Sequence, residues 1–179
     1  MTEVEALILL VEDARGQLLY VVDGLSDEQA AFKPAPDQWS IVEVVEHLYL
    51  AELSGVAKIW AARDALRAGR GWRDARPNRG QHIEAIIDAT WKPREVAPPI
   101  ATPHIGGPLA FWVACTRSLT PVLAALGAQL EDVALDEIVF PHFLSGPLDG
   151  RQRLEFLRFH LERHLKQIDA IRASAGFPA

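Results

Sequence analysis

The sequence predicts an all-α protein built as a four-helix bundle. Four stretches carry apolar residues at three-to-four spacing, the period of an amphipathic helix. No stretch has the convincing alternation of a strand. Proline and glycine cluster between these stretches, so we expect long connections between the helices. The 179 residues suffice for one sizeable core, and the sequence therefore predicts a single domain over residues 1–179.

The first helix is expected from about residue 3 to Asp23. Gly24 follows and is a favourable residue for ending a helix, because glycine readily adopts the left-handed conformation. Ser26 to Trp39 carries two prolines and is interpreted as a connection that cannot be a long helix. The apolar positions that define the helix are Val4, Leu7, Ile8, Val11, Leu18 and Val22.

The second helix is expected from Ile41 to about Ala68. It has a clear start, because the stretch Ser40-Ile-Val-Glu43 has the form of a capping box, in which each side chain accepts from a free backbone N–H. Trp39 just precedes this box and is expected to pack onto Val44.

A long excursion is expected from Trp72 to Pro108. Repeated prolines break the pattern there, and only His82 to Trp91 is able to form a short helix. Loops of this length are often binding lids or simple insertions, and both interpretations stay open. The third helix is expected over Leu109 to Leu126, where Pro121 either kinks it or marks a fresh start.

The fourth helix is expected from about Gly150 to Ala173. Residues 128 to 150 precede it and form another non-helical connection with several prolines and glycines. The buried stripe of the helix is predicted to contain Leu154, Leu157, Leu161, Leu165, Ile168 and Ile171.

Charge and composition exclude some classes of partner. The formal net charge of −6 disfavours nucleic acid, whose binding relies on clustered Lys and Arg. The N-terminus lacks the positive flank of a secretory signal, and we expect no apolar run that spans a bilayer. We therefore expect no membrane partner and a cytoplasmic location. The single Cys115 lies in an apolar run and is expected to be a small buried core residue.

Two histidines on the fourth helix are candidate metal ligands. His160 and His164 are four residues apart, which places both rings on one helix face, one turn apart. The face is apolar, because Phe156, four residues before His160, and Ile168, four residues after His164, lie on the same side of the helix. Buried imidazoles need partners for their nitrogens, and a metal ion satisfies one nitrogen on each ring. The alternative is a hydrogen-bonded pair of core histidines.

His47 strengthens the metal interpretation. It lies inside the second helix on a largely apolar face, so three inward histidines come from two helices. His47, His160 and His164 together form a facial set for a divalent metal ion, with zinc or nickel expected, and leave positions open for water or substrate.

The local sequence His160-Leu-Glu-Arg-His164 differs from the zincin peptidase motif. In that motif the glutamate directly follows the first histidine, whereas Glu162 comes two positions later. At about 200° around the helix, Glu162 is expected to face away from the two histidines. Peptidase chemistry with this glutamate as general base is therefore disfavoured.

Glu43 and Gln167 each allow more than one interpretation. Glu43 is one turn before His47 and either caps the helix, orients that histidine or serves as a base. Gln167 is expected either to bond to His164 or to lie at the bundle edge. His142 is a candidate for lining the mouth of the site. His82 and His104 are expected to be solvated.

Two stretches resemble the DinB-like, YfiT-type superfamily of bacterial metal-binding four-helix proteins. One is Asp37-Gln-Trp-Ser-Ile-Val-Glu-Val-Val-Glu-His47-Leu48, and the other is Gly146-Pro-Leu148 followed by Phe156-Leu-Arg-Phe-His160-Leu-Glu-Arg-His164-Leu-Lys-Gln-Ile168. The resemblance implies an up-down-down-up bundle, a homodimer, and metal ligands at the same three histidines. Phe140-Pro-His-Phe143 departs from the family, which more often has His before Pro.

Three candidate functions follow, the first two implied by the resemblance and the third by the weak general-base candidates. The first is a metal-dependent low-molecular-weight-thiol S-transferase, with a thiol and a small-molecule substrate as partners. The second is a metal-dependent hydrolase. The third is a non-catalytic metal or small-molecule binding protein.

Overall fold

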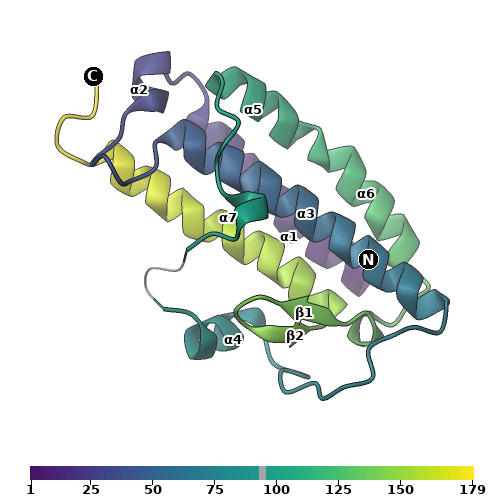
Figure 1. Cartoon of the computed structure of the whole chain (residues 1–179). Helices are drawn as coiled ribbons and strands as arrows, with labels where there is room; N and C mark the ends of the chain where they lie inside the picture. Colours follow the sequence, from purple (N-terminus) through teal and green to yellow (C-terminus); the bar gives the residue numbers. More distant parts are fainter. Residues whose placement is uncertain (93–95) are drawn as a thin grey trace.

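The computed structural model of the chain is mainly helical (Figure 1). It describes residues 1–92 and 96–179; residues 93–95, inside the expected Trp72–Pro108 connection, lie outside the described residues. α1 and α3 each contact α7 on one side and the α5–α6 segment on the other. The long helical segments are α1 (Glu3–Val22), α3 (Ile41–Arg67), α5 (Leu109–Arg117) with α6 (Leu119–Leu130), and α7 (Gly150–Arg172).

Capping boxes start the helices that carry the site. Ser40 Oγ accepts from the Glu43 N–H at 3.3 Å, and a Glu43 carboxylate oxygen accepts from the Ser40 N–H at 2.7 Å. The predicted start of α3 is therefore confirmed. Asp149 and Gln152 form the same reciprocal pair at the start of α7. A short helix, α2 (Asp27–Ala31), lies within the first connection.

The third predicted helix is divided in two. The break lies at Ser118, between α5 and α6, and Pro121 occupies the first turn of α6, where a missing N–H removes no helical bond. The prediction that this helix ends at Leu126 was wrong, since α6 continues to Leu130. Gly127 lies inside it, and a Cβ there would collide with Ile8 of α1, so glycine permits the close packing of α6 on α1.

The α5–α6 segment is apolar enough to resemble a membrane span. Leu109–Leu130 is long enough and has a mean hydropathy of 1.5, so the expectation that no apolar run approaches this length was wrong. Length and composition are weak evidence, because core helices of soluble proteins pass the same test. Trp112, Leu123 and Leu126 of this segment are buried in the main core.

A small hairpin departs from the predicted all-α class. β1 (Phe140–His142) pairs antiparallel with β2 (Gly146–Leu148), with His142 opposite Gly146. Strands of three residues that contain prolines are too short to show an alternating pattern, which is why the sequence did not reveal them. A 3₁₀ turn, η2 (Leu135–Glu137), precedes the hairpin. Asn78 holds the hairpin by donating to the carbonyls of Ser145 and Pro147.

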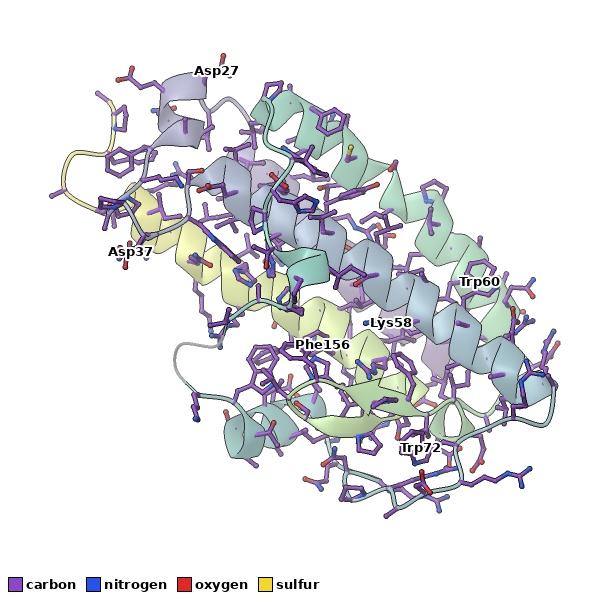
Figure 2. All side chains as sticks on the ribbon, viewed as in Figure 1. Asp27, Asp37, Lys58, Trp60, Trp72 and Phe156 are labelled. Atoms are coloured by element: carbon purple, nitrogen blue, oxygen red, sulfur yellow. The ribbon has the colours of Figure 1, made fainter. Side chains whose placement is uncertain are left out.

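The long connection runs along the bundle, where α4 (Ile83–Thr90) contacts α7 and η1 (Pro99–Ala101) contacts α3 (Figure 1). It contains α4, as predicted for His82–Trp91, and the 3₁₀ turn η1. Ile83, Ile86 and Ile87 of α4 form a second core with Leu148 and with the partly buried Phe156 and Phe159. η1 lies against α3, so the connection returns to the helix that carries His47 (Figure 2).

A buried ion pair lies between α1 and α3. Arg15 and Glu52 are only 1% and 4% exposed, and the guanidinium bonds to the carboxylate through two nitrogens. Arg15 also donates to Thr120 Oγ1 of α6 at 2.9 Å. This cluster ties together three helices inside an otherwise apolar core.

Candidate metal centre

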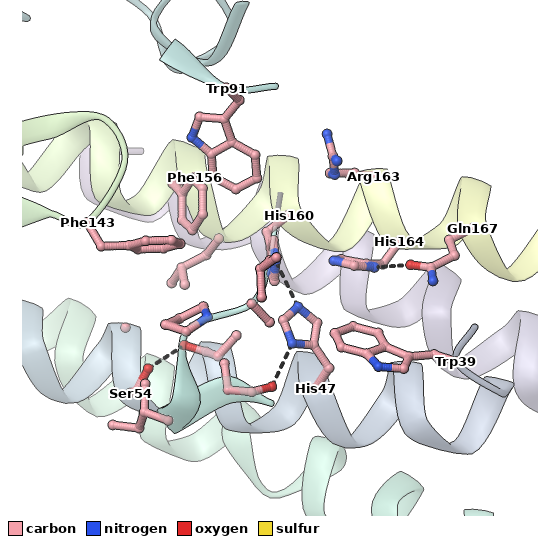
Figure 3. A pocket seen from close by; sticks show the side chains of 18 of the residues that line it. Trp39, His47, Ser54, Trp91, Phe143, Phe156, His160, Arg163, His164 and Gln167 are labelled. Carbon is pink, nitrogen blue, oxygen red and sulfur yellow. Dashed lines mark hydrogen bonds between the residues drawn. The ribbon is translucent and has the colours of Figure 1, made fainter. Parts of the chain in front are cut away.

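The three predicted histidines come together beside a cavity (Figure 3). His47 comes from α3, and His160 and His164 come from α7. Each ring offers one nitrogen, and the three nitrogens all lie within 4.8 Å of one another. The residues are between 3% and 9% exposed. The prediction that these side chains point inward and converge is therefore confirmed.

The ring of His47 is oriented by the backbone of η1. Its Nδ1 lies 2.7 Å from the carbonyl oxygen of Ala101, which is only an acceptor, so Nδ1 carries the hydrogen. Nε2 of a neutral ring then keeps its lone pair. This Nε2 lies 3.1 Å from Nε2 of His160.

Gln167 orients the third ring in the same way. Nδ1 of His164 donates to Oε1 of Gln167 at 2.6 Å, which leaves Nε2 as the nitrogen with a free lone pair. Of the two predicted roles for Gln167, the bond to His164 is confirmed. An outer hydrogen bond of this type fixes the tautomer and increases the basicity of a metal-binding histidine.

Burial keeps the three rings neutral. It lowers the pKa of His47, although the hydrogen bond to Ala101 opposes the shift. Burial is also the main cause that lowers the pKa of His164 to about 3. The pKa of His160 falls well below its usual value through burial and through the neighbouring His164 and His47. Neutral imidazole is the form that binds metal ions.

The donor set fits a divalent ion. Two nitrogens that each bond to zinc at about 2.0–2.1 Å in tetrahedral geometry lie about 3.3–3.4 Å apart. The separation of the His47 and His160 nitrogens is close to this, at 3.1 Å. All three nitrogens lie within 4.8 Å of one another, so only a small contraction separates the set from this geometry. Uncharged nitrogen donors of this kind suit zinc, nickel and copper better than calcium or magnesium.

Aromatic rings surround the histidines. The ring centroid of Trp39 lies 4.8 Å from that of His47 and 6.5 Å from that of His164, where the two rings are stacked. The ring of Phe156 stacks on His160 at 5.4 Å. Trp39 packs against the main core, as expected, but its ring also forms a wall of the site. Sequence reasoning missed this second role.

Glu46 holds a segment beside the candidate site, and sequence reasoning missed it. Its carboxylate is 1% exposed and accepts from the backbone N–H groups of His104, Ile105 and Gly106 at 2.6, 2.7 and 3.0 Å. These bonds fasten the segment that follows η1 to α3, directly beside His47. The available signal was a glutamate within the apolar run before His47.

The cavity beside the histidines has a volume of about 870 Å³. His142 lines it, as predicted, and is buried against the rings of Trp91 and Phe156. His82 and His104 are exposed, as predicted. Most of the wall is apolar or aromatic, with contributions from Trp39, Ile59, Trp91, Ile100, Phe143, Phe156 and Leu157.

Glu43 and Glu162, the two glutamates considered for roles beside the histidines, do not line the cavity. Glu162 forms an ion pair with Arg158 on the outside of α7, so the prediction that it faces away from the histidines is confirmed. Glu43 acts as the capping residue of α3 and also pairs with Lys33. Cys115 packs against the main core but is only half-buried, so it is more exposed than predicted.

Comparison with known proteins identifies the family. A search of curated proteins found no match. The family model of the DinB superfamily matches residues 10–168, a range that contains all three histidines and most of the helical structure. The chain therefore belongs to the DinB superfamily.

Proposed function

We propose that the protein is a metal-dependent S-transferase for a low-molecular-weight thiol, with the divalent ion on His47, His160 and His164. The observation that carries the proposal is the position of the three neutral histidines in the wall of a large cavity. Three protein ligands leave positions on the ion that face this cavity, as catalytic sites require. Membership in the DinB superfamily supports the metal site.

The chemistry follows from this arrangement. When bound, a divalent ion lowers the pKa of a thiol and favours the thiolate. The thiol sulfur forms a bond to an electrophilic carbon of the second substrate, the leaving group departs with its electron pair, and the thiol proton passes to solvent. Trp39 and Phe156 exclude water around the histidines, while Gln167 and the Ala101 carbonyl hold two of the rings.

The experiment compares conjugation with and without the ion. Protein loaded with zinc or nickel is incubated with glutathione and other bacterial thiols and with chlorinated or epoxide acceptors, and the thioether product is measured by mass spectrometry. We expect conjugation that disappears on chelation and in His164→Ala, and that survives in His82→Ala, a variant of an exposed histidine outside the cavity. Absence of metal-dependent conjugation across the panel would contradict the proposal.

Two other functions are distinguished by the same samples. A metal-dependent hydrolase would use the same open positions for water, and its activity on esters or amides would survive removal of all thiols. A non-catalytic binding protein is favoured by the scarcity of acids, since Asp37 is the one carboxylate among the described residues that line the cavity. In that case chelation lowers the melting temperature and no substrate is turned over.

The assembly is part of the proposal. We infer an up-down-down-up order of α1, α3, α5–α6 and α7 within one domain spanning residues 1–179, and a homodimer. The side-by-side packing of these segments supports the helix order. Size-exclusion chromatography with light scattering tests the dimer.

A further inference from the structure

The charged lining of the cavity is mainly positive, although the chain as a whole is acidic. The formal net charge of the chain is −6. Among the described lining residues, Lys58, Arg153 and Arg163 are cationic and Asp37 is the one carboxylate. A cavity with this lining attracts anions against the net charge of the molecule.

Arg153 is buried without an acidic partner. It is 8% exposed, one of its terminal nitrogens donates to the Phe140 carbonyl at 2.8 Å, and its guanidinium lies 3.8 Å from the centre of the Phe140 ring. Its Nε is buried and has no hydrogen-bond partner within the described part of the chain. In the same part of the chain no carboxylate forms an ion pair with it.

The acids nearest in sequence are engaged elsewhere. Asp149 caps α7 by accepting from the Gln152 N–H at 2.9 Å. Glu155 pairs with Arg151 and accepts from the Ile83 N–H at 3.0 Å. Neither acid neutralises Arg153.

A purely structural role does not account for this arginine. The Phe140 carbonyl takes one of five N–H donors, and the contact with the Phe140 ring gives none of the other four a hydrogen-bond acceptor. Burying the charge of Arg153 without a counter-ion is unfavourable. Arg153 also lies near the start of α7, where the positive end of the helix dipole disfavours a cation. Burial lowers the pKa of Arg153 only to about 9, so the charge persists at neutral pH.

Two further donors line the same cavity as Arg153. Nδ1 of His142 accepts from the N–H groups of Leu144 and Ser145, so the ring carries its hydrogen on Nε2. Lys58 is exposed at the cavity wall. The positive charges of Arg153 and Lys58 both act on His142, whose pKa falls to about 3 through burial first and then through these two groups.

We propose that Arg153, His142 and Lys58 form an anion subsite in the cavity, and that the molecule bound there carries a carboxylate on an apolar body. Arg153 supplies a forked donor that suits a carboxylate, His142 supplies an uncharged N–H, and Lys58 adds charge at the opening. The aromatic wall between the subsite and the histidines contacts the apolar body. This inference deepens the proposed function, because it assigns a chemical class to one of the two substrates.

Helix geometry gives the length of the ligand. Arg153 and His160 both line the cavity from α7 and are seven residues apart, which corresponds to about 10 Å along the helix axis. The carboxylate therefore lies roughly two helical turns from the metal centre. Either the thiol or its acceptor can supply this carboxylate, and the experiment separates the two sources.

The test measures binding to metal-free protein, so it does not depend on turnover. Isothermal titration calorimetry compares 4-phenylbutyrate with its uncharged amide, and glutathione with its diethyl ester. We expect the charged member of at least one pair to bind about tenfold or more tightly. Preference for phenylbutyrate assigns the subsite to the acceptor, and preference for glutathione assigns it to the thiol. Equal binding within both pairs overturns the proposal.

Variants and metal loading show whether the preference for the charged ligand comes from the subsite, from the charge of the protein surface or from the ion. Arg153→Met is expected to remove the preference for the charged ligand, whereas Lys166→Met, an exposed change on the same helix, is expected to leave it intact. If Arg153→Met does not fold, Lys58→Gln is expected to reduce the preference at an exposed position. Preference that appears only after metal loading places the carboxylate on the ion and also overturns the proposal. Absence of conjugation with a preserved preference would contradict the proposed function alone.

Discussion

His47 and Ala101 are 54 residues apart in the chain, yet the ring Nδ1 of one lies 2.7 Å from the carbonyl oxygen of the other. This bond decides which nitrogen of His47 faces His160. The candidate metal centre therefore depends on a loop between α4 and α5 as well as on the two helices that carry its histidines.

Glu46 is expected to control metal affinity without contacting the ion. Glu46→Gln keeps the size of the side chain but loses the charge that accepts three backbone N–H groups, which loosens the segment carrying Ala101. We expect metal affinity to fall about tenfold, as for other outer partners of ligands, measured by competition with a chelator. Glu43→Gln at the helix cap serves as the control. Unchanged affinity in a folded Glu46→Gln protein would show that the loop does not orient His47.

Gln167→Leu is expected to weaken the metal site through His164. The change removes the oxygen that accepts from Nδ1, so the ring loses its fixed tautomer. We expect a loss of metal affinity of about 10- to 100-fold, with the three ligands still present. Gln167→Glu, which keeps an acceptor, is expected to retain tight binding. Equal affinities in the two variants would exclude this role.

The metal-free protein is expected to lose stability as the pH falls below about 6.5. In the folded state burial lowers the pKa of His164 to about 3, whereas the unfolded chain titrates near the ordinary value of 6.5. Between these values the unfolded state binds protons that the folded state does not, so the free energy of unfolding decreases with decreasing pH. Urea unfolding at about pH 7.5 and pH 5 measures the effect. His164→Ala is expected to reduce the difference, and His82→Ala is expected to leave it unchanged.

Arg15→Met is expected to destabilise the bundle strongly. It leaves the buried Glu52 carboxylate without its cation, and breaking a buried ion pair from one side costs about 3–5 kcal/mol. The double variant Arg15→Met with Glu52→Leu removes both charges and is expected to be more stable than the single variant. Denaturant unfolding measures the three proteins. A double variant less stable than Arg15→Met alone would contradict this account.

Local signals predicted the helices and the histidine trio. The capping box at Ser40 lies within α3, and the four-residue spacing of His160 and His164 lies within α7. Inside a helix, the spacing of two residues in the sequence fixes their relative positions in space. The inward direction of His47 followed from its apolar neighbours for the same reason.

The features that the sequence did not predict depend on contacts between residues far apart in the chain. The hairpin at His142 is held by Asn78, and the partners of Glu46 are backbone groups of a loop more than fifty residues away. No periodic pattern marks such contacts. The end of α6 was misplaced, since Gly127 lies inside the helix and packs there against the Ile8 side chain of α1, a contact between helices that no local pattern marks.

One short turn serves two purposes in this molecule. Ile100 and Ala101 of η1 line the cavity, and the carbonyl of Ala101 also holds His47. A mutation that reshapes this part of the wall therefore also moves the carbonyl that orients His47, a candidate metal ligand. The shape of the cavity and the orientation of His47 consequently depend on the same few atoms.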